Sequence, residues 1–209
     1  MRTRIDVDSW NRKELYCFFK DFAEPFYGIT ADIDVTKLYL KCKSENQSFF
    51  VGSLYKILSA VNRCEPFRLR IESGELYRYD KIHVSPSIGK DNGTFAFSFM
   101  HYHPDFSLFK SEVENEIEKV KKVNGMNYTA DAARQDTIHF SAIPWVRFTS
   151  LSHARYLKGE DSAPKISTGK ITRSGDKYIM PLSVHVHHSL VDGKDVGEFI
   201  DLLQAIMDE

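Results

Sequence analysis

Residues 178–188, YIMPLSVHVHH, constrain the fold more than any other stretch of the sequence. Side chains of a β-strand point alternately to its two faces, and here apolar and polar residues alternate over most of the stretch. We therefore predict a strand whose apolar face bears Leu182, Val184 and Val186 and ends at His188. The opposite face is predicted to carry Ser183, His185 and His187.

Strand-like and helix-like patterns alternate along the rest of the chain. A period of two, or a short run rich in β-branched and aromatic residues, predicts strands. These runs are 28–35, 67–71, 76–79, 81–88, 94–102, 137–142, 145–150 and 165–171. Helices are predicted over 10–22, after a capping Ser9, and over about 50–62, 105–123 and about 194–207. The alternation predicts an α/β fold, an α+β two-layer sandwich rich in strands.

The size and charge of the chain limit its partners. With 209 residues, 42% of them hydrophobic, and no stretch typical of a linker, the chain is expected to form one domain over residues 1–209. Its 28 basic and 29 acidic residues give no overall field that would attract nucleic acid or an anionic membrane. No run approaches the roughly 20 apolar residues of a membrane span. No secretory signal is visible at the start, so we expect a cytoplasmic protein.

His188 is the first candidate for a functional residue. Because it ends an apolar row where a strand gives way to a loop, its imidazole is expected to be partly desolvated, which favours the neutral form. A neutral imidazole within reach of a substrate is what general-base catalysis requires. The same position also suits a core histidine bonded to a backbone carbonyl, and geometry alone leaves both interpretations open.

Pairs of histidines raise the alternative of a metal site. His101 and His103, like His185 and His187, lie two residues apart, so each pair would share a strand face and could ligate a transition metal. No Cys-x-x-Cys or His-Glu-x-x-His motif accompanies them. We therefore expect no metal.

An ordered set of motifs resembles one family. Residues 188–193, HSLVDG, preceded by His187, resemble the signature of the coenzyme A-dependent acyltransferases that include chloramphenicol acetyltransferase. The runs IDVT at 33–36, AVN at 60–62, FRLRI at 67–71, FSAIPWVRFTS at 140–150 and the Pro-x-x-x-x-Gly-Lys run at 164–170 are similar to that family, in its order. The resemblance covers nearly the whole chain. It implies an acyltransferase-like mixed β-sheet with helices packed on one face.

The resemblance also implies a reaction. An acetyl group would pass from acetyl-CoA, as co-substrate, to a hydroxyl of a small molecule, with chloramphenicol the best named acceptor and antibiotic resistance the associated role. His188 matches the family's general base, and Ser141 matches the serine that stabilises the tetrahedral oxyanion. No permanently bound cofactor is implied. The family forms homotrimers with active sites at the subunit interfaces, so a homotrimer is expected.

Further residues carry over as support and pocket. Asp192 matches an aspartate that pairs with an arginine near the chain start, here Arg12, and we expect a bidentate pair that holds the loop after His188. With no acid beside it, the tautomer of His188 would be set by a backbone carbonyl. Phe19 stands where chloramphenicol-binding members have a tyrosine, and this departure favours as an alternative a protein that acts on, or merely binds, a different hydroxylated molecule. The other residues expected in the acceptor pocket are Phe26, Tyr27 and Ser167, the last replacing a threonine.

Overall fold

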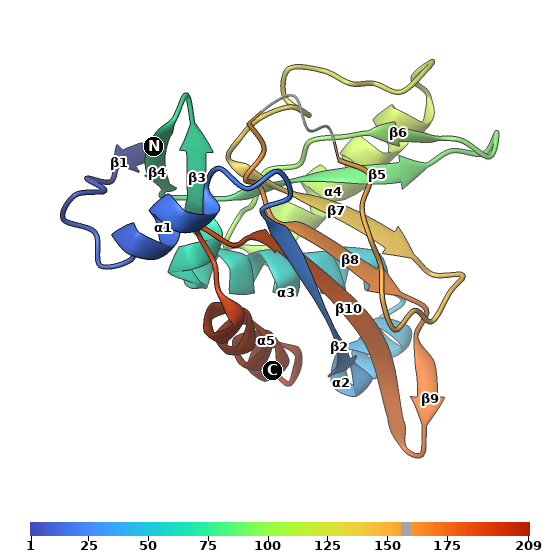
Figure 1. The fold of residues 1–209 in the computed structure, drawn as a ribbon. Coiled ribbons are helices and arrows are strands. Elements are labelled where there is room, and N and C mark those ends of the chain that lie inside the picture. The colour runs from blue at the N-terminus through green and yellow to red at the C-terminus, as the bar shows by residue number, and fades with distance from the viewer. Residues whose placement is uncertain (156–159) are drawn as a thin grey trace.

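The computed structural model describes residues 1–155 and 160–209 (Figure 1). Within these residues a seven-stranded sheet has the order β2-β10-β8-β7-β5-β6, and β9 pairs with β10. β5, β7 and β8 are parallel to one another, whereas the other pairings are antiparallel, so the sheet is mixed as predicted. The bounds are β2 Phe26–Asp34, β5 His83–Gly89, β6 Phe95–Phe97, β7 Thr137–Ile143, β8 Lys165–Gly169, β9 Thr172–Ser174 and β10 Lys177–His187.

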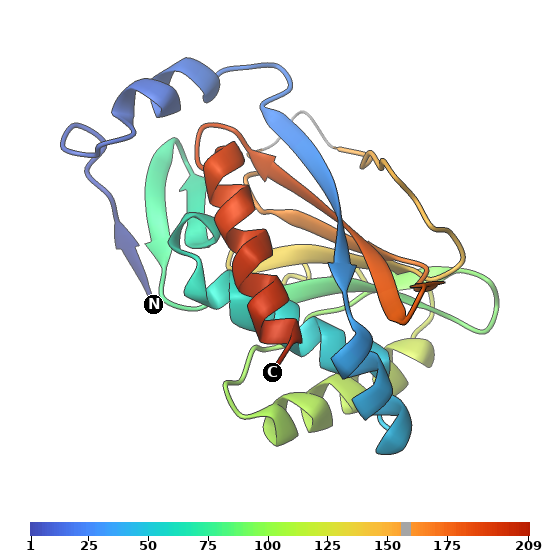
Figure 2. The same cartoon turned by 90° about the horizontal axis from the view of Figure 1, so that it is seen from below.

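A layer of helices covers one face of this sheet, as the resemblance implied (Figure 2). It consists of α2 Thr36–Ser44, α3 Phe49–Arg63, α4 Phe106–Lys121 and α5 Gly193–Met207. α3 contacts each of the other three. Side chains cap the starts of α3 and α4, because Ser48 accepts a hydrogen bond from the Val51 N–H and Asp105 accepts one from the Leu108 N–H. Among the helices described, none combines the length and apolar character needed to cross a bilayer.

The main core lies between the sheet and these helices. The apolar face of β10 contributes Leu182, Val184 and Val186, each at most 1% exposed, as the alternation predicted. From the helices, Phe199 of α5 stacks on Phe67 with ring centroids 4.3 Å apart, and both rings are fully buried. Burying side chains of this size contributes about 2–3 kcal/mol each. Burial of the apolar row therefore fixes which face of β10 packs on the helices, and the polar side chains of β10 lie on the opposite face.

A second, smaller sheet lies beside the main one (Figure 1). It has the order β1-β4-β3, and α1 lies near it. Arg70 of β3 is fully buried and joins the two sheets: its guanidinium donates to the carbonyls of Phe67 and Leu69, and also to those of Gln135 and Thr137, which lead into β7. The bounds are β1 Arg2–Arg4, α1 Lys13–Phe19, the 3-10 helix η1 Glu65–Arg68, β3 Leu69–Glu72 and β4 Glu75–Tyr79.

Several sequence-based boundaries were wrong. The first helix spans only Lys13–Phe19, and Ser9 does not cap it, because the Ser9 hydroxyl donates to Asp6 instead. Helix α2 was not predicted, and the segment 145–150, predicted as a strand, is irregular apart from a turn at its start and a bend at residue 149. The run 67–71 begins as η1 before it becomes β3, and the predicted strand 94–102 is regular only over Phe95–Phe97. In these places, the contacts that a segment makes in the folded chain outweigh its local helix or strand propensity.

Replacing Arg70 with methionine should lower the free energy of unfolding by about 3 kcal/mol, because three buried carbonyl oxygens and one partly buried carbonyl oxygen lose their donor. Urea denaturation monitored by circular dichroism measures this. Arg78→Met on the neighbouring strand β4 is the control, since that side chain is 40% exposed and its only described ion pair is with Glu65. Equal stability losses in the two variants would contradict the role given to Arg70.

Candidate active site

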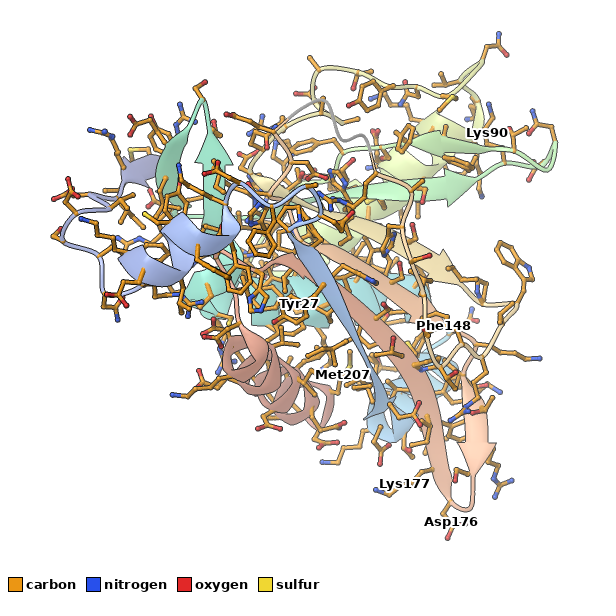
Figure 3. The ribbon with its side chains drawn as sticks, in the orientation of Figure 1. Tyr27, Lys90, Phe148, Asp176, Lys177 and Met207 are labelled. Carbon is orange, nitrogen blue, oxygen red and sulfur yellow. The ribbon has the colours of Figure 1, made fainter. Side chains whose placement is uncertain are left out.

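His188 lies immediately after β10, in the turn that leads to α5. Its backbone N–H donates to the Pro25 carbonyl at 2.8 Å, which fixes the turn against the segment before β2. Its imidazole stacks on the ring of Phe19, with the ring centroids 4.0 Å apart and 12° between the planes. It also packs against the ring of Tyr27, with the centroids 4.6 Å apart. Tyr27 is labelled near the start of β2 in Figure 3. Two aromatic rings therefore hold the half-buried imidazole in one orientation.

The two nitrogens of His188 differ in their surroundings. Nδ1 is buried and has no hydrogen-bond partner among the described residues. The expected hydrogen bond from Nδ1 to a backbone carbonyl is therefore not found among these residues, and ring stacking orients the imidazole instead. Because Nδ1 is buried, Nε2 is the nitrogen that a ligand can reach.

Arg12, just before α1, connects to the start of α5. A single guanidinium nitrogen, Nη1, donates to Oδ2 of Asp192 at 3.1 Å and to Oδ2 of Asp195 at 3.0 Å. The prediction of a bidentate Arg12–Asp192 pair was wrong in this respect: one nitrogen bridges two carboxylates, while Nε and Nη2 are buried without partners among the described residues. The sequence analysis missed Asp195, although an Asp-x-x-Asp spacing at a helix start is a sequence signal of a capping box, in which the two carboxylates accept hydrogen bonds from backbone N–H groups at the helix start.

Asp192 has a second task, as the N-cap of α5. Its carboxylate accepts from the N–H groups of Lys194 and Asp195, and the Asp195 carboxylate accepts from the Asp192 N–H, which completes a capping box. Burial alone would raise the pKa of Asp192, but the backbone donors and the charge of Arg12 bring it below its ordinary value. The turn that bears His188 is therefore anchored by β10 on one side and by a capped, ion-paired helix on the other.

Ser141, on β7, belongs to a row of hydroxyls that crosses the sheet. The strand registers place Ser141 beside Ser167 of β8, Ser167 beside Ser183 of β10, and Ser183 beside Thr30 of β2. The Ser141 hydroxyl lies 3.0 Å from that of Ser87 on β5. The Ser167 hydroxyl is buried and has no partner within the described part of the chain. A cavity of about 90 Å³ adjoins Ser87 and Ser141.

Ser141 and His188 are far apart within one chain. Ser183 is level with Ser141 in the sheet, and His188 lies five residues beyond Ser183. Five residues along a strand and two strand spacings across the sheet amount to on the order of 20 Å. Ser141 also shares the polar face with Ser183, whereas His188 packs on Tyr27, which is level with Val186 on the helix-covered face. The chain thus brings Arg12 to Asp192 and Phe19 to His188, but it does not bring the two predicted catalytic residues together.

Of the other predicted residues, two lie beside a predicted catalytic residue and one does not. Tyr27 lies against His188, and Ser167 lies beside Ser141. Phe26 instead carries the cations of Arg155 and Lys165 over its ring, at 3.8 and 4.7 Å, and its edge meets His187 at 5.4 Å.

One of the two histidine pairs lies on a strand as expected, since His185 and His187 share a face of β10, whereas the other pair does not. His101 and His103 do not lie on a regular strand, and their rings bond to the two carboxylate oxygens of Glu112, at 2.7 and 2.6 Å. His187 is buried, and its Nδ1 lies 2.8 Å from the Ser189 hydroxyl. Within residues 1–155 and 160–209, no three or more His, Cys, Asp or Glu side chains are grouped so as to hold a metal ion.

Comparison with known proteins gives one family. A family model described as Chloramphenicol acetyltransferase matches residues 1–204. A chloramphenicol acetyltransferase of Proteus mirabilis is 30% identical over 206 residues, which cover 98% of this chain and 94% of that protein. One of Clostridium butyricum is 30% identical over 97% of this chain and 93% of its own length. A solved chloramphenicol acetyltransferase, 29% identical, superposes with a TM-score of 0.92 over 99% of this chain and 100% of the other. Azotobacter vinelandii dihydrolipoamide acetyltransferase shares the fold, with a TM-score of 0.69 at 16% identity over 87% of this chain and 84% of the other.

The buried His187 should make stability fall in mild acid. Burial lowers the pKa of His187 to about 4, below its ordinary value of 6.5. The folded protein therefore resists protonation of His187. The contribution of the neutral imidazole to the free energy of unfolding is complete above pH 6.5 and is lost as the pH falls toward 4. By pH 4.5 the loss is about 2 kcal/mol. Urea denaturation at pH 7 and pH 4.5 should show a smaller drop for His187→Gln than for the wild type. A drop as large as the wild type's in His187→Gln would count against the burial effect.

Proposed function

The chain belongs to the chloramphenicol acetyltransferase family, and we propose that it transfers the acetyl group of acetyl-CoA to a hydroxyl of a small molecule, with chloramphenicol the named acceptor. The observation that carries this proposal is the family match over residues 1–204. The structure supports it by holding His188 at a strand end with Nε2 as the nitrogen within reach of a ligand.

His188 acts in this proposal as the general base. As the acceptor hydroxyl attacks the thioester carbonyl carbon, its proton passes to Nε2 of His188, and a new carbon–oxygen bond forms. The carbonyl oxygen becomes an oxyanion, which accepts a hydrogen bond from the Ser141 hydroxyl, a contact worth about 3 kcal/mol for a well-placed donor. Collapse of this intermediate breaks the carbon–sulfur bond, and the departing CoA sulfur takes the proton from His188.

Phe19 and Arg12 position the base. A phenyl ring at position 19 supplies no hydroxyl to the acceptor, but it stacks flat on the imidazole. Arg12 connects the start of α1 to Asp192 and Asp195, and so holds the helix that carries Phe19 against the turn that carries His188. This connection supports catalysis through geometry, with no acid–base step of its own.

The active site requires two protomers. His188 and Ser141 of one chain are separated by on the order of 20 Å, whereas both must touch one thioester. A homotrimer that places His188 of one subunit against Ser141 of the next satisfies this requirement and repeats one interface three times. The separation within the chain thus supports the assembly that the family resemblance implied.

Two inactive variants should restore activity when mixed. His188→Ala and Ser141→Ala should each lower turnover of acetyl-CoA and chloramphenicol by at least a hundredfold, since each removes one catalytic group. If the two variants are unfolded together and refolded as mixed trimers, roughly one interface in four pairs an intact His188 with an intact Ser141, so about a quarter of wild-type activity should return. Release of free thiol measures the rate.

Each variant refolded alone is the control and should stay inactive. Mixed trimers with no more activity than the controls would show that both groups act within one chain, which would overturn the shared site. Full activity in the unmixed His188→Ala variant would overturn the assignment of the base.

A further inference from the structure

We infer that Ser87 of β5 positions the hydroxyl of Ser141 for catalysis, because it donates a hydrogen bond that leaves the Ser141 proton free for the oxyanion. Ser87 is a positioning residue in this inference, since it acts through Ser141. The inference deepens the proposed function and rests on it, because it concerns the donor that the transferase uses to stabilise the tetrahedral intermediate.

Ser87 and Ser141 lie side by side on neighbouring strands. The register of the parallel strands β5 and β7 places Pro86 level with Phe140. Continued by one residue, this register places Ser87 level with Ser141, and the two hydroxyl oxygens are 3.0 Å apart. On its other side, Ser87 is paired with Phe97 of β6. Ser87 is therefore held between two strands, and it extends the row of hydroxyls by one strand.

The hydrogen bonding of the pair leaves one proton free. A serine hydroxyl has one proton to donate and two lone pairs that accept. The 3.0 Å contact uses one of the two protons, and among residues 1–155 and 160–209 it is the only hydrogen bond that either hydroxyl makes. The pair therefore keeps one donor available for a ligand.

The direction of the bond follows from the charge that develops in the reaction. When the thioester oxygen becomes an oxyanion, the Ser141 proton points to it, and the Ser141 oxygen then has only lone pairs to offer to Ser87. Ser87 is therefore the donor in the transition state. Hydrogen bonds in such a chain polarise one another, so the bond from Ser87 strengthens the bond from Ser141 to the oxyanion.

Of the serines near Ser141, Ser87 is the one whose hydroxyl can orient it. Ser85, the previous residue of β5 on the same face, is buried, and its hydroxyl donates to the Ala132 carbonyl at 3.0 Å. Ser167, level with Ser141 on β8, makes no side-chain hydrogen bond within the described part of the chain. Both Ser87 and Ser141 are half-buried and adjoin the cavity of about 90 Å³, so a carbonyl group that enters it can reach the pair.

The orientation of Ser141 has to be set within its own chain. In the proposed trimer, His188 comes from a neighbouring subunit, so it cannot hold the Ser141 hydroxyl before the substrates bind. The paired strands β5 and β7 provide a rigid support, since Val84 is level with Ile138 and both side chains are fully buried. Groups mounted on packed strands keep their positions better than groups on loops.

Removing the Ser87 hydroxyl should lower kcat and leave KM almost unchanged. In Ser87→Ala, the Ser141 hydroxyl loses its donor in the transition state, so kcat for acetylation of chloramphenicol should fall about five- to tenfold, with the KM of both substrates within about twofold of the wild type. Ser87→Thr keeps a hydroxyl and should keep at least about half of the wild-type kcat. Thiol release from acetyl-CoA by the intact protein measures both constants. A wild-type kcat in Ser87→Ala, or a loss confined to KM, would overturn the inference.

A double-mutant cycle shows whether Ser87 acts through Ser141. In the Ser141→Ala background Ser87 has no hydroxyl to orient, so adding Ser87→Ala should change kcat by less than about twofold. A further loss of about five- to tenfold in the double variant would show that the two residues act independently, which excludes the positioning role. Should Ser87→Ala fail to fold, Ser87→Cys replaces it with the same expectations, because a thiol of similar size is only a weak donor.

Ser85→Ala is the matched control, because it removes a hydroxyl from the same face of the same strand. It deletes the buried hydrogen bond to the Ala132 carbonyl, so the Tm should fall by a few degrees while kcat stays within about twofold of the wild type. Equal losses of kcat in Ser85→Ala and Ser87→Ala would show that the effect comes from a disturbed β5, and the inference would fail.

The same measurements separate the inference from the proposed function. If the wild type releases no thiol from acetyl-CoA in the presence of chloramphenicol, the proposed function fails, and the positioning role fails with it. If the wild type is active and Ser141→Ala lowers turnover about a hundredfold, a wild-type kcat in Ser87→Ala leaves the proposed function standing and overturns the inference alone.

Discussion

The register of β10 with β2 and β8 is the constraint on which the rest of the structure depends. It directs Leu182, Val184 and Val186 into the helical layer, and it leaves Ser183 and His185 on the other face. A slip of one residue would reverse both faces, so burial of the apolar row fixes where every polar group of β10 lies. The core that stabilises the fold thereby also builds the polar face, with its row of hydroxyls.

Much of the fold could be predicted from the sequence, because strong periodicity specifies elements well. The alternation in β10 and the apolar stripe of α4 both gave the correct type of element, and the motif set gave the correct sheet and helical layer. The misses have local causes. Helix α2 carries a weak apolar stripe, and its residues are helical because Leu38 and Cys42 pack into the core. The run at 145–150 has strand-like composition but turns away after β7.

The candidate site could be predicted in part. The motif gave His188 and its connection through Asp192 to Arg12, but sequence could not show that Arg12 also binds Asp195 or that Phe19 stacks on His188, since both depend on how α1 packs. The row of hydroxyls needed the strand registers, because its members come from separate strands. A motif identifies single residues, whereas the set of polar and charged side chains that share a sheet face is known only once the strand pairing is known.

The most direct test of the account is the distance between His188 and Ser141 in a crystal structure of the assembled protein with CoA bound. The account predicts that Nε2 of each His188 lies within about 8 Å of the Ser141 hydroxyl of a neighbouring subunit, close enough for both to touch one reacting carbonyl. Within a chain the same two atoms should remain on the order of 20 Å apart. An assembly in which every His188 is farther than about 12 Å from all Ser141 hydroxyls would contradict the shared active site.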